Sequence, residues 1–498
     1  YNATGLNNTY IGSQSGAGAS GQSNSNNTAV GKDALLAVTT GGYNTVIGSG
    51  AGDAITDGHE NVMIGRSAGT GTTSVGFSVI IGKDAAQADM TATADGTVAI
   101  GYSALSALTS GSQNVAIGYQ AAALLTTGAN NTVLGHQALD AADRTESGNV
   151  AIGTLAMSAC DEGSHASADI MDNVCIGYAA GLGGSFGSSD LDMERNVAIG
   201  YGAMDGTGSL ACEDNVFIGA YAGSGTWATA GSTTNVGIGS YSMDAAMNGA
   251  SGNTAVGYNT LTALTEADGN TAIGLRSMDS VTTGNYNVAI GQDSLAGCEG
   301  GATNTALGTT ALYGVTSGDN NIGIGLDAGR AASPSGNLTT QDDIVCIGNT
   351  SIAAVYVETD AWTTSDIRDK ADIANFDGGL DWINAMQPIS YVWDKRAWYC
   401  ETKDADGNLV DVTPQDILDA EPDGTHKKSS VEVGFSAQAI LELEQSLGYG
   451  SNNDTSLLVD LTGDGTKYSL KRAHMIPMLV NAIKELSAKV EELEEKLK

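Results

Sequence analysis

A short motif repeats along roughly the first 350 residues of the chain. Its core is Asn-(Val/Thr)-small-(Ile/Val/Leu)-Gly, as in Asn44-Thr-Val-Ile-Gly48 and Asn114-Val-Ala-Ile-Gly118. The nineteen closing glycines fall at positions 12, 31, 48, 65, 82, 101, 118, 135, 153, 177, 200, 219, 239, 257, 274, 291, 308, 325 and 348. Nine of the eighteen spacings are 17 residues, which indicates a stack of equivalent units rather than a set of globular domains.

Each copy carries the signals of a strand, a corner and a turn. The alternation in Val-Ala-Ile has a period of two, which predicts a short strand with Val and Ile on one face. The glycine that follows permits a bend or a close backbone approach. Stretches such as Thr126-Thr-Gly-Ala-Asn-Asn131 supply the asparagine and glycine of a turn before the next copy.

The longer spacings, of 18 to 24 residues, cluster between Gly135 and Gly257. We expect the extra residues to leave the stack as surface loops, which makes 154–256 the irregular part of the array. The stretch 154–234, with Trp227, is the candidate receptor-binding surface.

A single unit cannot fold alone. It offers only two or three large apolar side chains, and their burial does not offset the conformational entropy lost on ordering about 17 residues. Backbone pairing between units and a core shared among several chains must supply the difference. The pattern therefore favours an elongated homotrimer.

Composition excludes several classes. There are 68 glycines without a G-X-Y period, so the chain is not a collagen, and no apolar run is long enough to cross a membrane. Residues 1–350 hold 7 basic and 30 acidic side chains, a balance that should repel nucleic acid and anionic membranes. We expect no cofactor and no metal site, although bound divalent cations are an alternative explanation of the acidic surface.

Three other features have a structural and a functional interpretation. The six cysteines show no CxxC spacing and are expected to be small buried residues. The glycines of Gly323-Ile-Gly325 resemble a nucleotide-binding loop but lie in one more repeat without a βαβ unit. Tyrosines recur just after the repeat glycine, and corner packing is favoured over glycan binding for this set: Tyr102, Tyr119, Tyr178, Tyr201 and Tyr258.

The repeats resemble the head repeats of trimeric autotransporter adhesins of the YadA type, and more closely the Asn-Thr-Ala-Ile-Gly repeats of phage tail fibres. The resemblance covers about 70% of the chain. It implies a trimeric β-roll or β-prism shaft without an active site.

The pattern changes after position 348. Residues 351–357 read as a last strand, 380–386 as a helix that stops before Pro388, and 389–393 as a strand. The acidic stretches that begin at Asp404 and Asp460 are better explained as hairpin turns than as calcium loops. The final helix has apolar residues spaced 3-4-3-4, a heptad seam compatible with a trimeric coiled coil: Ile476, Leu479, Ile483, Leu486, Val490, Leu493 and Leu497.

This C-terminal region resembles the intramolecular chaperone domain of phage endosialidases and many tail fibres. The matching segments, in order, are Ser365-Asp-Ile-Arg-Asp-Lys370, Ile383-Asn-Ala-Met-Gln-Pro-Ile-Ser-Tyr391, Gly434-Phe-Ser-Ala-Gln438 and Ile476-Pro-Met-Leu-Val-Asn-Ala-Ile-Lys484. The resemblance implies that the domain trimerises and folds the shaft and then cuts itself off between Thr364 and Ser365. Ser365 would be the nucleophile and Lys370 the base, with Arg368 as a charge that lowers the lysine pKa. The alternative is that Arg368 and Lys370 only pair with neighbouring aspartates.

The predicted organisation is mainly β. A repeat shaft occupies 1–350, a last strand and linker 351–364, a small α+β chaperone and autoprotease domain 365–474, and a coiled-coil helix 475–498. The predicted function is a structural and adhesive tail fibre on a virion, and the only predicted enzymatic activity is the self-cleavage. Expected partners are two further copies, a host-surface receptor of glycan or protein type, and other tail or baseplate proteins bound through a segment upstream of Tyr1. The alternative is a bacterial trimeric surface adhesin or extracellular filament.

Overall fold

The computed structural model describes residues 5–497 apart from 19–21, 162–169, 184–191, 209, 228–229, 353–372, 401–411, 452–454 and 462–465. The chain divides into two compact units, Tyr1–Thr309 and Thr310–Lys498.

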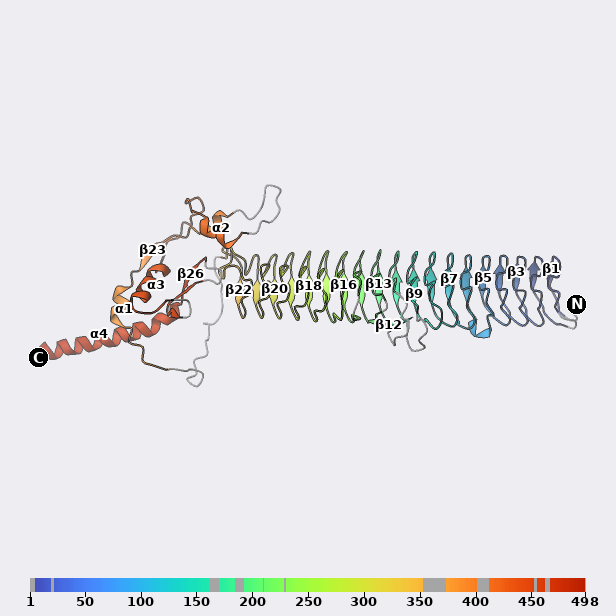
Figure 1. Ribbon diagram of the computed structural model, residues 1–498, viewed down its shortest axis with the longest axis horizontal. Coiled ribbons are helices and arrows are strands. Elements are labelled where there is room, and N and C mark those ends of the chain that lie inside the picture. The colour runs from blue at the N-terminus through green and yellow to red at the C-terminus, as the bar shows by residue number, and fades with distance from the viewer. Residues whose placement is uncertain are drawn as a thin grey trace. The chain divides into compact units, whose positions relative to one another are not determined.

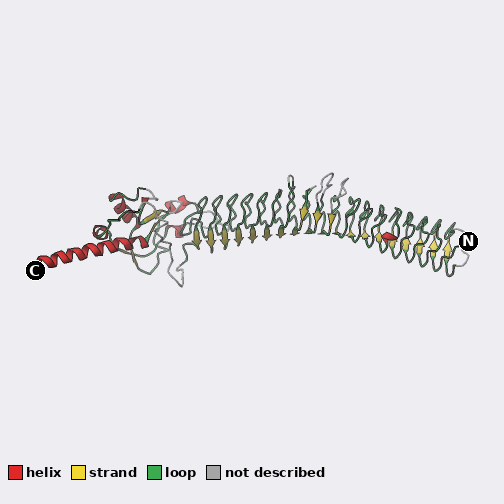
Figure 2. Ribbon diagram, turned by 90° about the horizontal axis from the view of Figure 1, so that it is seen from below, coloured by secondary structure: helices red, strands yellow, loops and turns green. Residues whose placement is uncertain are grey.

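The first unit is a β-solenoid of stacked rungs (Figures 1 and 2). Each repeat core forms one strand of three residues that ends just before the closing glycine. The strands are β1 (Thr9–Ile11), β2 (Thr28–Val30), β3 (Thr45–Ile47), β4 (Val62–Ile64), β5 (Val79–Ile81), β6 (Val98–Ile100), β7 (Val115–Ile117), β8 (Thr132–Leu134), β9 (Val150–Ile152), β11 (Val174–Ile176), β13 (Val197–Ile199), β15 (Val216–Ile218), β16 (Val236–Ile238), β17 (Thr254–Val256), β18 (Thr271–Ile273), β19 (Val288–Ile290) and β20 (Thr305–Leu307).

Neighbouring strands pair in parallel, and every pair keeps the same register. Val46 of β3 lies opposite Met63 of β4, and Ala99 of β6 lies opposite Ala116 of β7. Equivalent repeat positions therefore stack into columns along the solenoid. The register survives the longest insertion, since β9 pairs directly with β11. The sequence predicts surface loops for these insertions, but part of the extra sequence is buried, with Ile170, Met193 and Cys212 at 0% exposure, while 162–169 and 184–191 lie outside the described residues.

Part of the inserted sequence forms a second, short parallel ladder. It consists of β10 (Ile170–Met171), β12 (Met193–Glu194) and β14 (Cys212–Glu213). A single turn of 3-10 helix, η1 (Ala92–Ala94), lies in another inserted stretch. Trp227, which lies between β15 and β16 in the sequence, is only 3% exposed. The predicted receptor-binding stretch thus keeps its one tryptophan inside the solenoid.

The middle residue of each strand points into the solenoid, and its two neighbours point out. Ala29, Ala99 and Ala116 have no exposed surface, whereas the flanking Val or Thr and Ile are partly or largely exposed. The largest fully buried middle residue is Phe217 of β15, and two glycines make room for it. A Cβ at Gly223 or Gly237 would lie 2.7 Å from the ring of Phe217.

The closing glycines stack directly on one another. Gly118 has a φ of +146°, and a Cβ there would lie 2.1 Å from the carbonyl oxygen of Gly135. The same geometry recurs from rung to rung, which explains why this position is glycine in every copy. The close approach lets the backbone turn the corner without breaking the stack.

The motif asparagines form a buried ladder of amides. The Nδ2 of Asn196 donates to Oδ1 of Asn173 at 3.0 Å and to the carbonyl oxygen of Cys212 at 2.6 Å. Its own Oδ1 accepts from the backbone N and the Nδ2 of Asn215. The side chain thus satisfies backbone groups at the turn of each rung, and this role accounts for the asparagine that opens the motif. Ser78 and Thr97 replace asparagine at two successive rungs.

The second unit begins with two more repeats and continues into a small α+β domain. Strands β21 (Ile322–Ile324) and β22 (Val345–Ile347) pair in parallel. The later elements are α1 (Leu380–Ala385), β23 (Ile389–Tyr391), η3 (Arg396–Tyr399), α2 (Pro414–Asp419), β24 (Glu432–Gly434), α3 (Ala437–Ser446), β25 (Val459–Leu461), β26 (Tyr468–Leu470), η5 (Arg472–His474) and α4 (Met475–Leu497). β23 pairs with β24 and β25 with β26, both antiparallel.

The sequence places the early elements of this domain well. The predicted helix 380–386 and strand 389–393 appear as α1 and β23. Asp460 itself lies in β25, which pairs antiparallel with β26, and the predicted turn at 462–465 lies outside the described residues. Most of the expected last strand, 351–357, and the whole stretch 401–411 lie outside the described residues.

The domain has its own apolar core. Its buried members are Trp382 of α1, Met386 directly after α1, Ile440 of α3, Leu458, Val459 of β25 and Met478 of α4. A buried carboxylate, that of Glu444 on α3, accepts hydrogen bonds from the Ser456 hydroxyl at 2.6 Å and from the backbone N of Leu458 at 2.5 Å. These bonds tie α3 to the segment that leads into β25.

Candidate functional site

The proposed self-cleavage residues cannot be located in the fold. Thr364, Ser365, Arg368 and Lys370 all lie outside the described residues. The structure does show two separate exposed apolar surfaces. One lies on helix α4 and the adjoining part of the C-terminal domain, and the other lies on the outer face of the solenoid strands.

Helix α4 is attached to its domain along one face. Met478 and Ala482 are buried there, at 2% and 5% exposure. The Nδ2 of Asn481 donates to the carbonyl oxygen of Phe376 at 2.7 Å, and a carboxylate oxygen of Glu485 accepts from the backbone N of Leu380 at 3.0 Å. This anchoring fixes the start of α4 and determines which of its faces points away from the domain.

The opposite face of α4 carries the predicted heptad seam, and it is exposed. The exposed fractions are 60% for Ile476, 45% for Leu479, 63% for Ile483, 52% for Leu486, 47% for Val490, 59% for Leu493 and 87% for Leu497. Large aliphatic side chains in one continuous row are typical of a surface that a partner covers. Whether this row forms a coiled coil remains a prediction.

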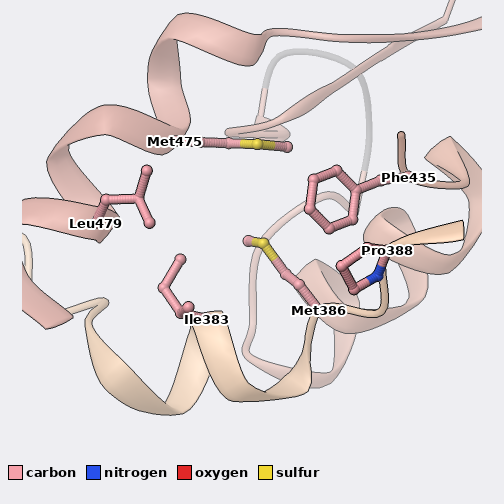
Figure 3. Close-up of a pocket in the computed structure, with 6 residues that line it drawn as sticks. All are labelled: Ile383, Met386, Pro388, Phe435, Met475 and Leu479. Carbon is pink, nitrogen blue, oxygen red and sulfur yellow. The ribbon is translucent and has the colours of Figure 1, made fainter. Parts of the chain in front are cut away.

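An apolar cavity of about 190 Å³ adjoins the start of the seam (Figure 3). Figure 3 shows the side chains of α1 and α4 facing each other across it, with Phe435 closing one side. Leu479 belongs both to the cavity wall and to the seam, so the two features form one surface. The lining residues are Ile383, Met386, Pro388, Phe435, Met475 and Leu479. Sequence reasoning missed the contribution of Met475 and Phe435, because only the fold brings them together.

The solenoid exposes a second apolar row, formed by the last residue of each strand. Ile47 is 39% exposed, Ile273 38% and Ile290 41%, while the residue before each is fully buried. Because the register is constant, these side chains stack into a stripe along the strand face. We call it the isoleucine stripe.

The domain also holds a half-buried lysine among aromatic rings. The Nζ of Lys395 lies 4.9 Å from the ring centre of Trp393 and 5.6 Å from that of Trp398. Burial lowers the pKa of Lys395, and the nearby charge of Lys428 lowers it further, while Glu432 acts in the opposite direction. The two indole rings favour the cation by contact with their faces.

The cysteines are distributed mainly in the core. All six are free, and all but Cys400 are buried, which agrees with their interpretation as small core residues. Burial raises the pKa of the Cys175 thiol to about 12, so the thiol is protonated at neutral pH and a poor nucleophile. No group of three or more His, Cys, Asp or Glu among the described residues is arranged to hold a metal ion.

No described helix has the length and apolar character needed to cross a bilayer. Of the tyrosines after the repeat glycines, Tyr102 stacks on Tyr119 and Tyr178 on Tyr201, and all five residues remain 39% to 51% exposed. Corner packing thus accounts for part of each ring only.

Comparison with known proteins gives one match. Residues 365–449 match the family model of the chaperone of endosialidase. The match spans α1 to α3 and begins at the serine proposed as the nucleophile. No curated protein and no solved structure matches the chain.

Proposed function

We propose, from the chaperone-of-endosialidase domain at residues 365–449, that the chain is a trimeric tail fibre of a virus. In this proposal the solenoid is the fibre shaft and recognises a host surface. The C-terminal domain brings three chains together, promotes folding of the shaft and then cleaves itself off before Ser365. The same fibre would attach to other tail proteins through its N-terminal end.

The observation that carries the proposal is the pair of unpartnered apolar rows. The isoleucine stripe and the α4 seam are each a single row of aliphatic side chains left exposed by the single chain. Burying such side chains gains on the order of 1.5 to 3 kcal/mol each. Packing against further copies would cover each row, and mixed Ile, Leu and Val in the seam is compatible with three strands.

A trimerising domain solves a kinetic problem of such a shaft. Parallel pairing between distant residues is slow to nucleate, because loop-closure entropy is lost before contacts form. Helices that hold three chains together raise the local concentration of the ends from which the shaft grows. A finished shaft then persists after the domain leaves, because its unfolding is slow.

Self-cleavage needs a serine whose proton is taken by a neutral base. In the proposal Ser365 supplies the hydroxyl, and Lys370 accepts the proton when the charge of Arg368 keeps the lysine pKa low. The Ser365 hydroxyl attacks the carbonyl carbon of Thr364, so that an ester forms while the peptide bond between the two residues breaks, and the proton held by Lys370 passes to the amine of Ser365. Water then hydrolyses the ester, which leaves the carboxylate of Thr364 and restores the serine hydroxyl. Cleavage then separates the shaft from the domain and α4.

The test is expression of the full chain beside the Ser365→Ala variant, with Ser390→Ala as a control serine in the same domain. Intact mass spectrometry should show a break between residues 364 and 365 in the parent chain and in Ser390→Ala. Ser365→Ala should give one full-length species. Cleavage at that bond in Ser365→Ala would refute the assignment, and light scattering on the same samples tests for three chains.

A further inference from the structure

The residues that directly follow the repeat glycine form a column along the corner of the solenoid. In seven successive rungs, from β2 to β8, all members are exposed. They are Lys32, Ser49, Arg66, Lys83, Tyr102, Tyr119 and His136. We call this set the corner column. Its basic members lie in the early rungs and its rings in the later ones.

Four members of the corner column contact one another in a continuous series. The Nζ of Lys83 lies 4.7 Å from the ring centre of Tyr102. The rings of Tyr102 and Tyr119 stack at 5.2 Å with 15° between their planes, and Tyr119 and His136 stack at 5.0 Å with 9°. Stacking covers the ring faces. Even so, Tyr102 remains 39% exposed and Tyr119 46%.

The charges of the column differ from those of the shaft around it. Residues 1–350 hold only 7 basic side chains, and three of them are here. Lys32 pairs with Asp33, while Lys83 and Arg66 share Asp84 at 2.9 and 3.8 Å. The side chains of Lys32, Arg66 and Lys83 are 69%, 61% and 43% exposed, but those of Asp33 and Asp84 only 21% and 17%. At this corner the basic groups are therefore more accessible to a ligand than the carboxylates that pair with them.

We propose that the corner column binds a linear acidic polysaccharide of a cell surface, laid parallel to the shaft axis. The inference rests on the proposed function and assigns the receptor class and its contact residues. The cations meet the carboxylates of the polymer, and the tyrosine hydroxyls donate to them, in charge-assisted hydrogen bonds. Rungs repeat at about 4.8 Å, and an extended pyranose chain advances by a similar length per sugar.

The stacking geometry also argues against a neutral glycan. Sugars without charge bind proteins largely by placing a C–H face on an aromatic face, and the faces of Tyr102 and Tyr119 are occupied. Edge hydroxyls and cations favour an anionic ligand instead. An acidic peptide meets the same charges but lacks the regular spacing of an extended sugar chain.

A second tyrosine column provides an internal control. Tyr178 and Tyr201 stack at 5.0 Å with 11° between their planes, at the same position after the repeat glycine. Their exposure, 45% and 51%, matches that of the corner column. No lysine or arginine occupies that position in those rungs or in the rung before them. Aromatic stacking is therefore present there without the charges.

The experiment measures binding of alginate oligomers, a linear polyuronate, to the full chain by isothermal titration calorimetry. Dextran serves as the neutral polymer and polyglutamate as the acidic peptide. Arg66→Ala with Lys83→Ala removes the cations, and Tyr119→Phe removes one hydroxyl while keeping the stack. Tyr201→Phe is the matched control. Light scattering on each variant reports whether assembly is intact.

The parent chain should bind alginate, with affinity falling at about 0.5 M sodium chloride, and should ignore dextran. The double variant should lose at least about tenfold in affinity and Tyr119→Phe about threefold or more, while Tyr201→Phe should match the parent chain. Absence of alginate binding by an intact trimer would overturn the polysaccharide inference and leave the fibre proposal standing. Equal binding of polyglutamate, or equal losses in both tyrosine variants, would also overturn it. A chain that does not assemble counts against the fibre proposal itself.

Discussion

At the scale of single residues, two positions of the repeat motif are needed for the solenoid to fold, each for a different physical reason. The closing glycine is required by space and by backbone conformation together, since its φ is positive and the next rung lies against it. The opening asparagine is required by hydrogen bonding, because its amide satisfies groups that no water reaches. Substitutions at the two positions should therefore fail in different ways.

Gly118→Ala should prevent normal stacking of the rungs. The added Cβ would meet the carbonyl oxygen of Gly135 at 2.1 Å, so we expect a cost of about 3 kcal/mol or more. Gly252→Ala is the matched control, because Gly252 also has a positive φ but a Cβ there has nothing within 4 Å. That variant should lose only about 1 kcal/mol. Chemical denaturation measures the free energy of unfolding of both variants. Similar losses of that free energy in the two would contradict the stacking argument.

Asn196→Ala should destabilise the shaft by about 2 to 4 kcal/mol, because it leaves buried backbone groups without partners. The groups affected include the carbonyl oxygen of Cys212 and the backbone N of Asn215. Gln87→Ala, at an exposed position, should change the denaturation midpoint little. Equal midpoints for the two variants would show that the amide ladder contributes no stability.

At the scale of elements, the repeat contains a position for half-buried carboxylates. Five aspartates lie five residues after a closing glycine, and burial is the main cause that raises the pKa of each: Asp53, Asp140, Asp205, Asp244 and Asp279. A raised pKa means that folding disfavours the charged form. The same slot therefore imposes a shared pH dependence on several rungs.

Mild acid should stabilise the shaft through this slot. Between the raised folded pKa and the ordinary value of 3.8, the folded chain binds more protons than the unfolded chain. The free energy of unfolding therefore rises as the pH falls from 7 through the folded pKa, and it levels off below the ordinary value. Melting temperatures measured from pH 7 to pH 4.5 test this expectation.

Removing the charges at the slot should flatten that dependence. The triple variant Asp140→Asn, Asp205→Asn, Asp244→Asn should melt higher than the parent chain at pH 7 and gain less on acidification. Its control removes the same number of charges from exposed positions, by Asp89→Asn, Glu266→Gln and Glu299→Gln. If the control behaves like the slot variant, net charge and not burial causes the effect.

At the scale of the whole molecule, the proposed trimer explains why the single chain leaves so many large apolar side chains exposed. The solenoid buries small residues inside and leaves isoleucines outside, which is unfavourable for a single chain in water. Helix α4 repeats that arrangement, with Met478 and Ala482 packed on the domain and Ile483 and its seam neighbours exposed. Both rows make sense as contacts with other copies.

Ile483→Asp, made in the Ser365→Ala background so that α4 stays attached, should abolish trimer formation. A carboxylate in the seam would have to lose its water in the centre of the assembly, which costs several kcal/mol per copy. Lys484→Asp is the control, because it places the same residue next to the seam on an exposed face. Static light scattering that finds three chains in Ile483→Asp would disprove the role of the seam.

The repeat sequence by itself determined the strands, their spacing and the stacking, because glycine geometry and asparagine bonding act within one unit and its neighbours. The sequence after the repeats also indicated the family of the C-terminal domain, because short segments such as 434–438 can be recognised by their residues and their order alone. The tertiary structure decided which face of each strand is buried. A period of two shows that Val and Ile share a face of the strand. It does not show whether that face points into the solenoid or out to solvent, because this depends on the width of the rung. It also decided the cavity beside Leu479 and the stacking of Tyr102 on Tyr119, because both are made by residues that meet only when distant segments or successive rungs pack together.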